Sequence, residues 1–117
     1  MLYNKKNKTQ KIPSKLLQKE KHFILLLLNT SKIQAQCLLD TSTTQQIKTV
    51  SEISRNLLKL PLSGEAEIQV KKKKFILNKL ASYSISNRSK SLVISKYNNS
   101  ILVLLRSVKQ PLVELLS

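Results

Sequence analysis

The stretch Lys71-Lys72-Lys73-Lys74-Phe75-Ile76-Leu77 runs four consecutive lysines into an apolar segment, and no acidic residue follows before Glu114. We predict a strand over residues 74–80, with ammonium groups crowded at its beginning. Ammonium groups at this density repel one another unless a polyanion lies beside them. The whole chain has 21 basic and 6 acidic residues and a net charge of +15, so we expect that polyanion to be nucleic acid.

The composition excludes several classes of function. A chain of 117 residues has room for a single domain. Its one cysteine, Cys37, which we expect to be buried and inert, rules out an internal disulfide and a multi-cysteine zinc site. One histidine, one cysteine and scattered carboxylates provide no nucleophile with a base, so we predict no enzyme, no cofactor and no metal site.

Hydropathy and residue usage exclude some kinds of binding partner. The longest apolar run, residues 23–28, is far shorter than the roughly 20 residues that cross a bilayer, so we predict no membrane partner. The single glycine, Gly64, cannot form a glycine-rich phosphate loop, and we predict no small-molecule substrate. Lysine outnumbers arginine 18 to 3, which is typical of AT-rich coding in organelle genomes.

The beginning of the chain is predicted to be a tail. Residues 1–20 contain six lysines and no regular apolar period, so we expect disorder in isolation. The tail is interpreted as a solvated extension, an RNA-contacting arm or an import leader. Residues 21–117 are predicted to form one domain.

Within that domain, residues 21–29 are typical of a strand buried on both faces. Residues 30–40 are ambiguous, with some helical spacing. Residues 41–60 give the clearest helix, with Thr43 or Thr44 as its cap, a regular apolar stripe and Pro61 as its stop.

The second half is predicted to be mostly extended. Residues 64–70 alternate between apolar and polar side chains, and strands are expected at 74–80, 92–94 and 101–105, with a long loop spanning 81–100. A short helix with Pro111 in its first turn follows. The order predicts an α+β fold, a truncated ferredoxin-like split βαβ sheet with helices on one face and no closing strand.

From Gly64 onward the chain resembles the bacterial-type small-subunit ribosomal protein S-ten family. That family has a glycine, an extended segment, a basic cluster and a strand that begins with phenylalanine, and residues 64–77 follow this order without a gap. Residues 86–94 are similar to its basic loop and next strand, residues 101–104 to its last strand before the second helix, and residues 112–116 to that helix. The resemblance implies a structural protein in the head of the small ribosomal subunit that binds ribosomal RNA and neighbouring head proteins. The diverged sequence suggests a mitochondrial ribosome, with a plastid one as the alternative.

The candidate RNA contacts follow from charge and from the loop. They are Lys71, Lys72, Lys73, Lys74, Tyr83, Asn87, Arg88, Lys90, Lys96 and Tyr97. The lysines would neutralise phosphates and the tyrosines would stack on unpaired bases. In the simpler alternative, the lysines are a solvated charge run and the tyrosines pack at the rim of the sheet.

Two further expectations depend on these assignments. A sheet without its closing strand has an open edge, and we expect a separate chain or RNA to cover it. The competing function is a stand-alone basic RNA-binding or RNA-maturation protein, which would fold and stay soluble without RNA.

Overall fold

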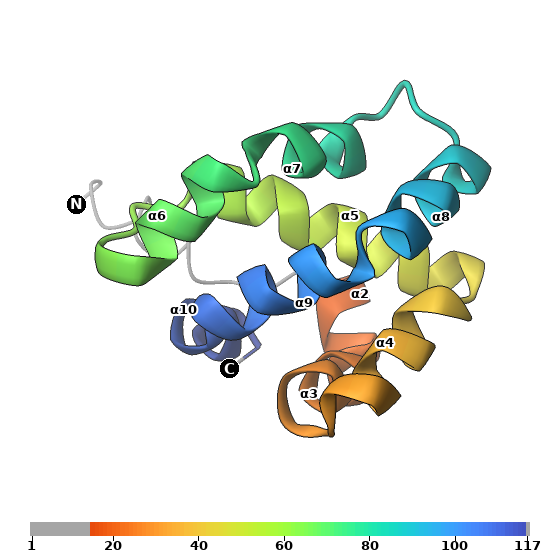
Figure 1. The fold of residues 1–117 in the computed structure, drawn as a ribbon, viewed down its shortest axis with the longest axis horizontal. Coiled ribbons are helices and arrows are strands. Elements are labelled where there is room, and N and C mark those ends of the chain that lie inside the picture. Colours follow the sequence, from red (N-terminus) through yellow and green to blue (C-terminus); the bar gives the residue numbers. More distant parts are fainter. Residues whose placement is uncertain (1–14, 117) are drawn as a thin grey trace.

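The computed structural model describes residues 15–116, and every regular element in that part of the chain is an α-helix (Figure 1). In chain order the described helices are α2 (Lys15–Lys19), α3 (Lys21–Asn29), α4 (Lys32–Asp40), α5 (Thr44–Lys59), α6 (Gly64–Lys72), α7 (Lys74–Ala81), α8 (Asn87–Lys96), α9 (Asn98–Ser107) and α10 (Lys109–Leu115). None of the described helices is long and apolar enough to span a membrane. The predicted α+β fold with a ferredoxin-like sheet is therefore wrong.

The predicted first strand is helix α3. Its buried side chains are Phe23, Ile24, Leu27 and Leu28, whereas Leu26 is partly exposed. That spacing belongs to one face of a helix, because residues three and four apart lie on the same side. A short run that is apolar at nearly every position fits a buried strand and a buried helix equally well, and this ambiguity produced the error.

The extended segment 64–70 and the strand 74–80 are helices α6 and α7. The charge order favours helix here, because Glu65 and Glu67 lie in the first turn of α6 and basic residues lie in its last turn. Glu67 also pairs with Lys71 one turn later, at 3.3 Å between the carboxylate oxygen and Nζ. The alternation of apolar residues did not mark a buried face, since Ile68 is exposed.

The long extended loop and the two later strands are also wrong. Residues 87–96 form α8 and residues 98–107 form α9, so only residues 82–86 and Tyr97 are left outside helices in this region. Ser86 begins α8 as its N-cap, with its hydroxyl accepting from the N–H of Ser89 at 3.2 Å. Since the described residues contain no sheet, they leave no open strand edge for another chain to cover.

Several neighbouring helices meet at bends. At Lys73 the N–H donates to the carbonyl of Gln69, and its own carbonyl accepts from the N–H of Leu77, at 2.9 and 3.0 Å. Equivalent hydrogen bonds cross Tyr97, between α8 and α9, and Val108, between α9 and α10. The helical hydrogen-bond pattern thus continues through each bend, and α6 with α7 forms one bent rod while α8, α9 and α10 form another.

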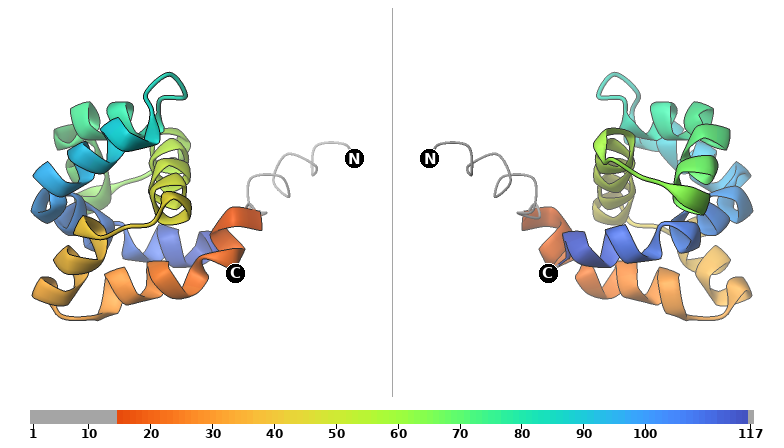
Figure 2. Two further views of the ribbon diagram at one scale, coloured as in Figure 1. Left: turned by 90° about the vertical axis from the view of Figure 1, so that its right-hand side faces the viewer. Right: turned by 90° about the vertical axis from the view of Figure 1, so that its left-hand side faces the viewer.

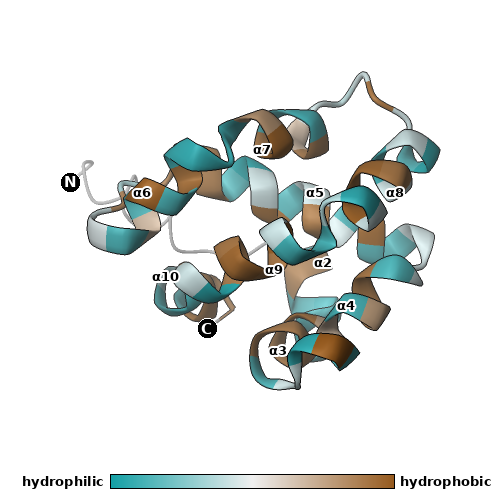
Figure 3. Cartoon of the chain, in the orientation of Figure 1, coloured by the Kyte–Doolittle hydropathy of each residue, from teal (hydrophilic) through white to brown (hydrophobic). Residues whose placement is uncertain are grey.

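Helix α5 confirms its prediction. Thr43 is the N-cap in a complete capping box with Gln46, and the helix ends before Pro61. Its apolar stripe is buried against α7, α8 and α2, and hydrophobic and hydrophilic residues alternate along it (Figure 3). The helix runs along the length of the molecule in Figure 1, and the turned views of Figure 2 show α3 lying across that direction. The last predicted helix is likewise present as α10, with Pro111 in its first turn.

The two halves of the chain are tied together by polar contacts at helix ends. Arg106 donates to the carbonyls of Leu27 and Thr30, with distances of 3.0 and 2.6 Å from Nη2. The Asp40 carboxylate accepts from the side-chain amide of Asn98 at 2.8 Å. These bonds satisfy the free carbonyls at the C-terminal end of α3 and fix α4 beside the α8–α9 bend.

The predicted tail falls largely outside the described residues. Its last part, residues 15–19, is helix α2, and the Leu17 side chain there is fully buried. Tail lysines 5, 6, 8 and 11 lie outside the described residues.

Candidate anion-binding site

The four consecutive lysines lie on the bend between α6 and α7. Lys71, Lys72 and Lys74 are exposed and Lys73 is half-buried. Successive residues of a helix point about 100° apart, so the four ammonium groups fan around the rod. Among them only Lys71 has an ion-pair partner within the described residues.

Three other predicted residues, Arg88, Lys96 and Tyr97, lie on α8 or directly after it. Arg88 and Lys96 are exposed. The Lys96 ammonium lies 5.3 Å from the ring centre of Tyr97, which packs against the core. The Tyr97 ring therefore already packs against other parts of the protein, which makes it a poor platform for stacking on a base.

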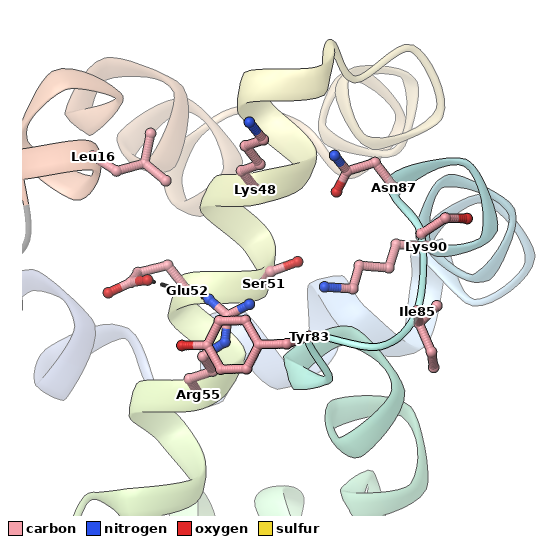
Figure 4. A pocket seen from close by; sticks show the side chains of 10 residues that line it. Leu16, Lys48, Ser51, Glu52, Arg55, Tyr83, Ile85, Asn87 and Lys90 are labelled. Carbon is pink, nitrogen blue, oxygen red and sulfur yellow. Dashed lines mark hydrogen bonds and ion pairs between the residues drawn. The ribbon is translucent and has the colours of Figure 1, made fainter.

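The remaining predicted residues, Tyr83, Asn87 and Lys90, line a single pocket together with residues of α5 (Figure 4). Its volume is about 430 Å³, within the range of small-molecule sites. Within the described residues its lining is Leu16, Lys48, Ser51, Glu52, Arg55, Tyr83, Ile85, Ser86, Asn87 and Lys90. We call this the α5–α8 pocket.

Lys90 is the most unusual side chain in the pocket, because it is a lysine with only 4% of its surface exposed. Its ammonium end points across the pocket toward α5, between Ser51 and Tyr83 (Figure 4). Within the described residues it makes no hydrogen bond or ion pair. Burial lowers the pKa of Lys90, and the nearby positive charge of Arg55 lowers this pKa further.

Ser51 faces the same space from the middle of α5. The residue is 2% exposed, and its hydroxyl oxygen has no hydrogen-bond partner within the described residues. A buried hydroxyl without a partner costs free energy, which a bound ligand would recover. Within the described residues the Ser51 hydroxyl and the Lys90 ammonium, which faces the pocket, are thus two polar groups without partners at one pocket.

Arg55 is held rigidly at the pocket wall. Its Nε donates to the carbonyl of Ala81 at 2.9 Å, and its Nη1 lies 3.3 Å from a carboxylate oxygen of Glu52. The guanidinium also lies 3.8 Å from the ring centre of Tyr83. One face of the Tyr83 ring is thus covered by Arg55, although the residue as a whole is 84% exposed.

The N-terminal end of α8 completes the rim. Ser86 and Asn87 line the pocket as the N-cap and first residue of this helix. Within the described residues the backbone N–H groups of Asn87 and Arg88 have no hydrogen-bond partner. Such free N–H groups carry partial positive charge and favour an anion nearby.

The charges of the pocket do not balance. Lys48, Arg55 and Lys90 contribute three positive charges, and Glu52 contributes the only negative one. No group of three or more histidine, cysteine or acidic side chains in the described part of the chain could hold a metal ion. The arrangement is therefore suited to holding an anion with charge and hydrogen bonds.

The α5 side of this pocket was not among the predicted site residues. Lys48, Ser51 and Arg55 recur at helical spacing beside the apolar stripe of α5, a helix that was predicted correctly. That spacing could have marked a polar face, but nothing local indicates that α8 packs across it. The expectation of a buried Cys37 was also wrong, since this residue is exposed on α4.

Comparison with protein-family models, with curated proteins and with solved structures finds no match to this chain.

Proposed function

We propose that this protein binds RNA through its phosphate groups, as a basic helical domain that neutralises charge. The observation behind the proposal is unpaired positive charge. Residues 15–116 carry 17 basic and 6 acidic side chains. Only two ion pairs, Arg55 with Glu52 and Lys71 with Glu67, form within this part of the chain.

The contacts are proposed to be of the positioning kind, which do not read sequence. Lysine is a compact point charge without the two-pronged geometry that recognises a base edge. Exposed lysines on the α6–α7 bend, with Arg88 and Lys96 on α8, offer such charges from two bent rods. The tail lysines would add to them.

The fold favours the stand-alone form of this function over the ribosomal one. A core of 23 buried hydrophobic residues closes within residues 15–116, so folding does not call for a partner. The ribosomal role rested on a resemblance whose implied sheet is absent from the described residues. Membership of an organellar small subunit, with a mitochondrial or plastid location, is therefore kept as the alternative, and a separate experiment below tests it.

A salt series tests the proposal directly. Binding of a fluorescent RNA is measured by anisotropy from 50 to 300 mM KCl. A slope of log K against log salt of roughly −0.7 to −0.9 per phosphate contact is expected. Changing all four lysines of residues 71–74 to glutamine should make this slope shallower by about two to three.

The control changes an equal number of exposed lysines outside the tail and the bend, namely Lys21, Lys32, Lys59 and Lys109. Failure to bind RNA at low salt would overturn the proposal. In cell extracts, co-sedimentation with small ribosomal subunits that survives a moderate salt wash would support the ribosomal role. A free pool at all salt concentrations would support the stand-alone one.

A further inference from the structure

We propose that the α5–α8 pocket binds the phosphorylated end of a nucleic-acid strand, with the terminal phosphate inside and the adjoining base on Tyr83. This inference deepens the proposed function. The binding of a nucleic-acid strand rests on that function, whereas the binding of a phosphate in the pocket is independent of it. Three features of the pocket carry the inference.

The first is the match of charge. A phosphate monoester, such as a strand end or a nucleotide, carries close to two negative charges at neutral pH, because its second pKa is about 6. A phosphodiester inside a strand carries one. The surplus of Lys48, Arg55 and Lys90 over Glu52 equals the monoester's charge.

The second feature is the unsatisfied donors. The Ser51 hydroxyl is buried, whereas the Lys90 ammonium faces the pocket from a side chain that is 4% exposed, and neither group has a partner within the described residues. The free N–H group of Asn87, at the start of α8, belongs to a residue that lines the pocket. Phosphate oxygens accept charge-assisted hydrogen bonds from all of these groups. The bonds to Lys90 would replace the hydrogen bonds to water that this side chain loses on burial.

The third feature is size. A volume of about 430 Å³ has space for roughly fourteen waters at their liquid volume, well beyond a bare phosphate. The excess suits a sugar and part of a base. The ring of Tyr83 is packed on Arg55 at one face and is otherwise exposed, so its outer face is open to stacking.

The test compares four probes on the full chain: inorganic phosphate, uridine 5′-monophosphate, a 10-nucleotide RNA with a 5′-phosphate, and the same RNA with a 5′-hydroxyl. We expect the phosphorylated RNA to bind about tenfold more tightly than the hydroxyl form, because only it provides the second charge. Uridine monophosphate at a hundredfold excess over its Kd should raise the melting temperature by about 10 °C.

Two variants assign the effect to the pocket. Lys90→Met and Ser51→Ala should each reduce the preference for the phosphorylated end to about twofold or less, and each leaves a residue of similar size in place. Lys72→Gln, on the exposed bend, should weaken both RNAs equally and keep the preference. Tyr83→Ala should weaken uridine monophosphate and leave inorganic phosphate unchanged.

The outcomes separate this inference from the proposed function. Equal binding of the two RNAs, with no stabilisation by uridine monophosphate, would overturn the pocket proposal while RNA binding stands. Stabilisation by uridine monophosphate without any RNA binding would overturn the proposed function and the strand, leaving a nucleotide site. Unchanged end preference in Lys90→Met, with the folded state verified by circular dichroism, would overturn the assignment to this pocket.

Discussion

Replacing Lys90 by methionine should stabilise the protein in phosphate-free buffer. The lysine stem is buried, its ammonium has no partner within the described residues, and Arg55 adds a like charge nearby. A fully buried ion costs several kcal/mol, and because this ammonium end faces a pocket we expect about 1–2 kcal/mol to be recovered. For a domain of this size that raises the melting temperature by about 4–8 °C. Methionine keeps the length and apolar packing of the stem.

The pH dependence has a definite sign. Burial lowers the pKa of Lys90 in the folded state, so between that value and the unfolded value of about 10.4 the unfolded chain binds more protons. The unfolding free energy of the wild type therefore rises with pH in this window. The Lys90→Met variant lacks the effect, so its advantage is full below the folded pKa and shrinks as pH increases.

Thermal unfolding by circular dichroism between pH 7 and pH 10 measures both effects. Lys48→Met is the matched control, because Lys48 lines the same pocket but is exposed, and its replacement should change stability by less than about 0.5 kcal/mol. A melting temperature of Lys90→Met equal to or below that of the wild type at pH 7 would refute the reasoning. So would an advantage that grows with pH.

Three structural contacts give further predictions, each measured as urea unfolding free energy. Arg106→Met should cost about 2–3 kcal/mol, because partly buried carbonyls of Leu27 and Thr30 lose a charged donor, whereas the exposed Arg88→Met should cost under about 0.5 kcal/mol; equal costs would contradict a stabilising role for these Arg106 hydrogen bonds. Asp40→Ala should cost about 1 kcal/mol through its bond to Asn98, and the double variant with Asn98→Ala should cost little more than either alone. Thr43→Ala should cost about 1 kcal/mol by removing the α5 cap, and no loss would rule out the capping box.

Helix α5 could be predicted because its signals are local. A capping threonine, a regular stripe and Pro61 act within a few residues of one another and need no tertiary information. Residues 23–28 and 101–105 carry no such signal, since nearly every position is apolar. The rarity of glycine and proline was the better guide there, because a sheet of several strands needs turns that this composition scarcely provides.

The candidate site was half predictable for a related reason. Tyr83, Asn87 and Lys90 were selected from the basic and aromatic content of one segment, although the extended loop expected there is mostly helix. Their joint role depends on α8 packing across α5, which brings residues about forty positions apart in the chain to one pocket. The resulting burial of Lys90 cannot be inferred from its neighbours in sequence, Ser89 and Ser91, which are both polar.

The two groups of basic residues should respond differently to salt. Exposed lysines on the α6–α7 bend act through solvent, where the Debye length is about 8 Å at physiological ionic strength. Lys90 in the α5–α8 pocket is 4% exposed, so salt screens its charge less. Rising salt should therefore weaken the overall affinity for RNA while the ratio between phosphorylated and unphosphorylated ends is kept. A ratio that collapses together with the affinity would place the end preference on the surface and not in the pocket.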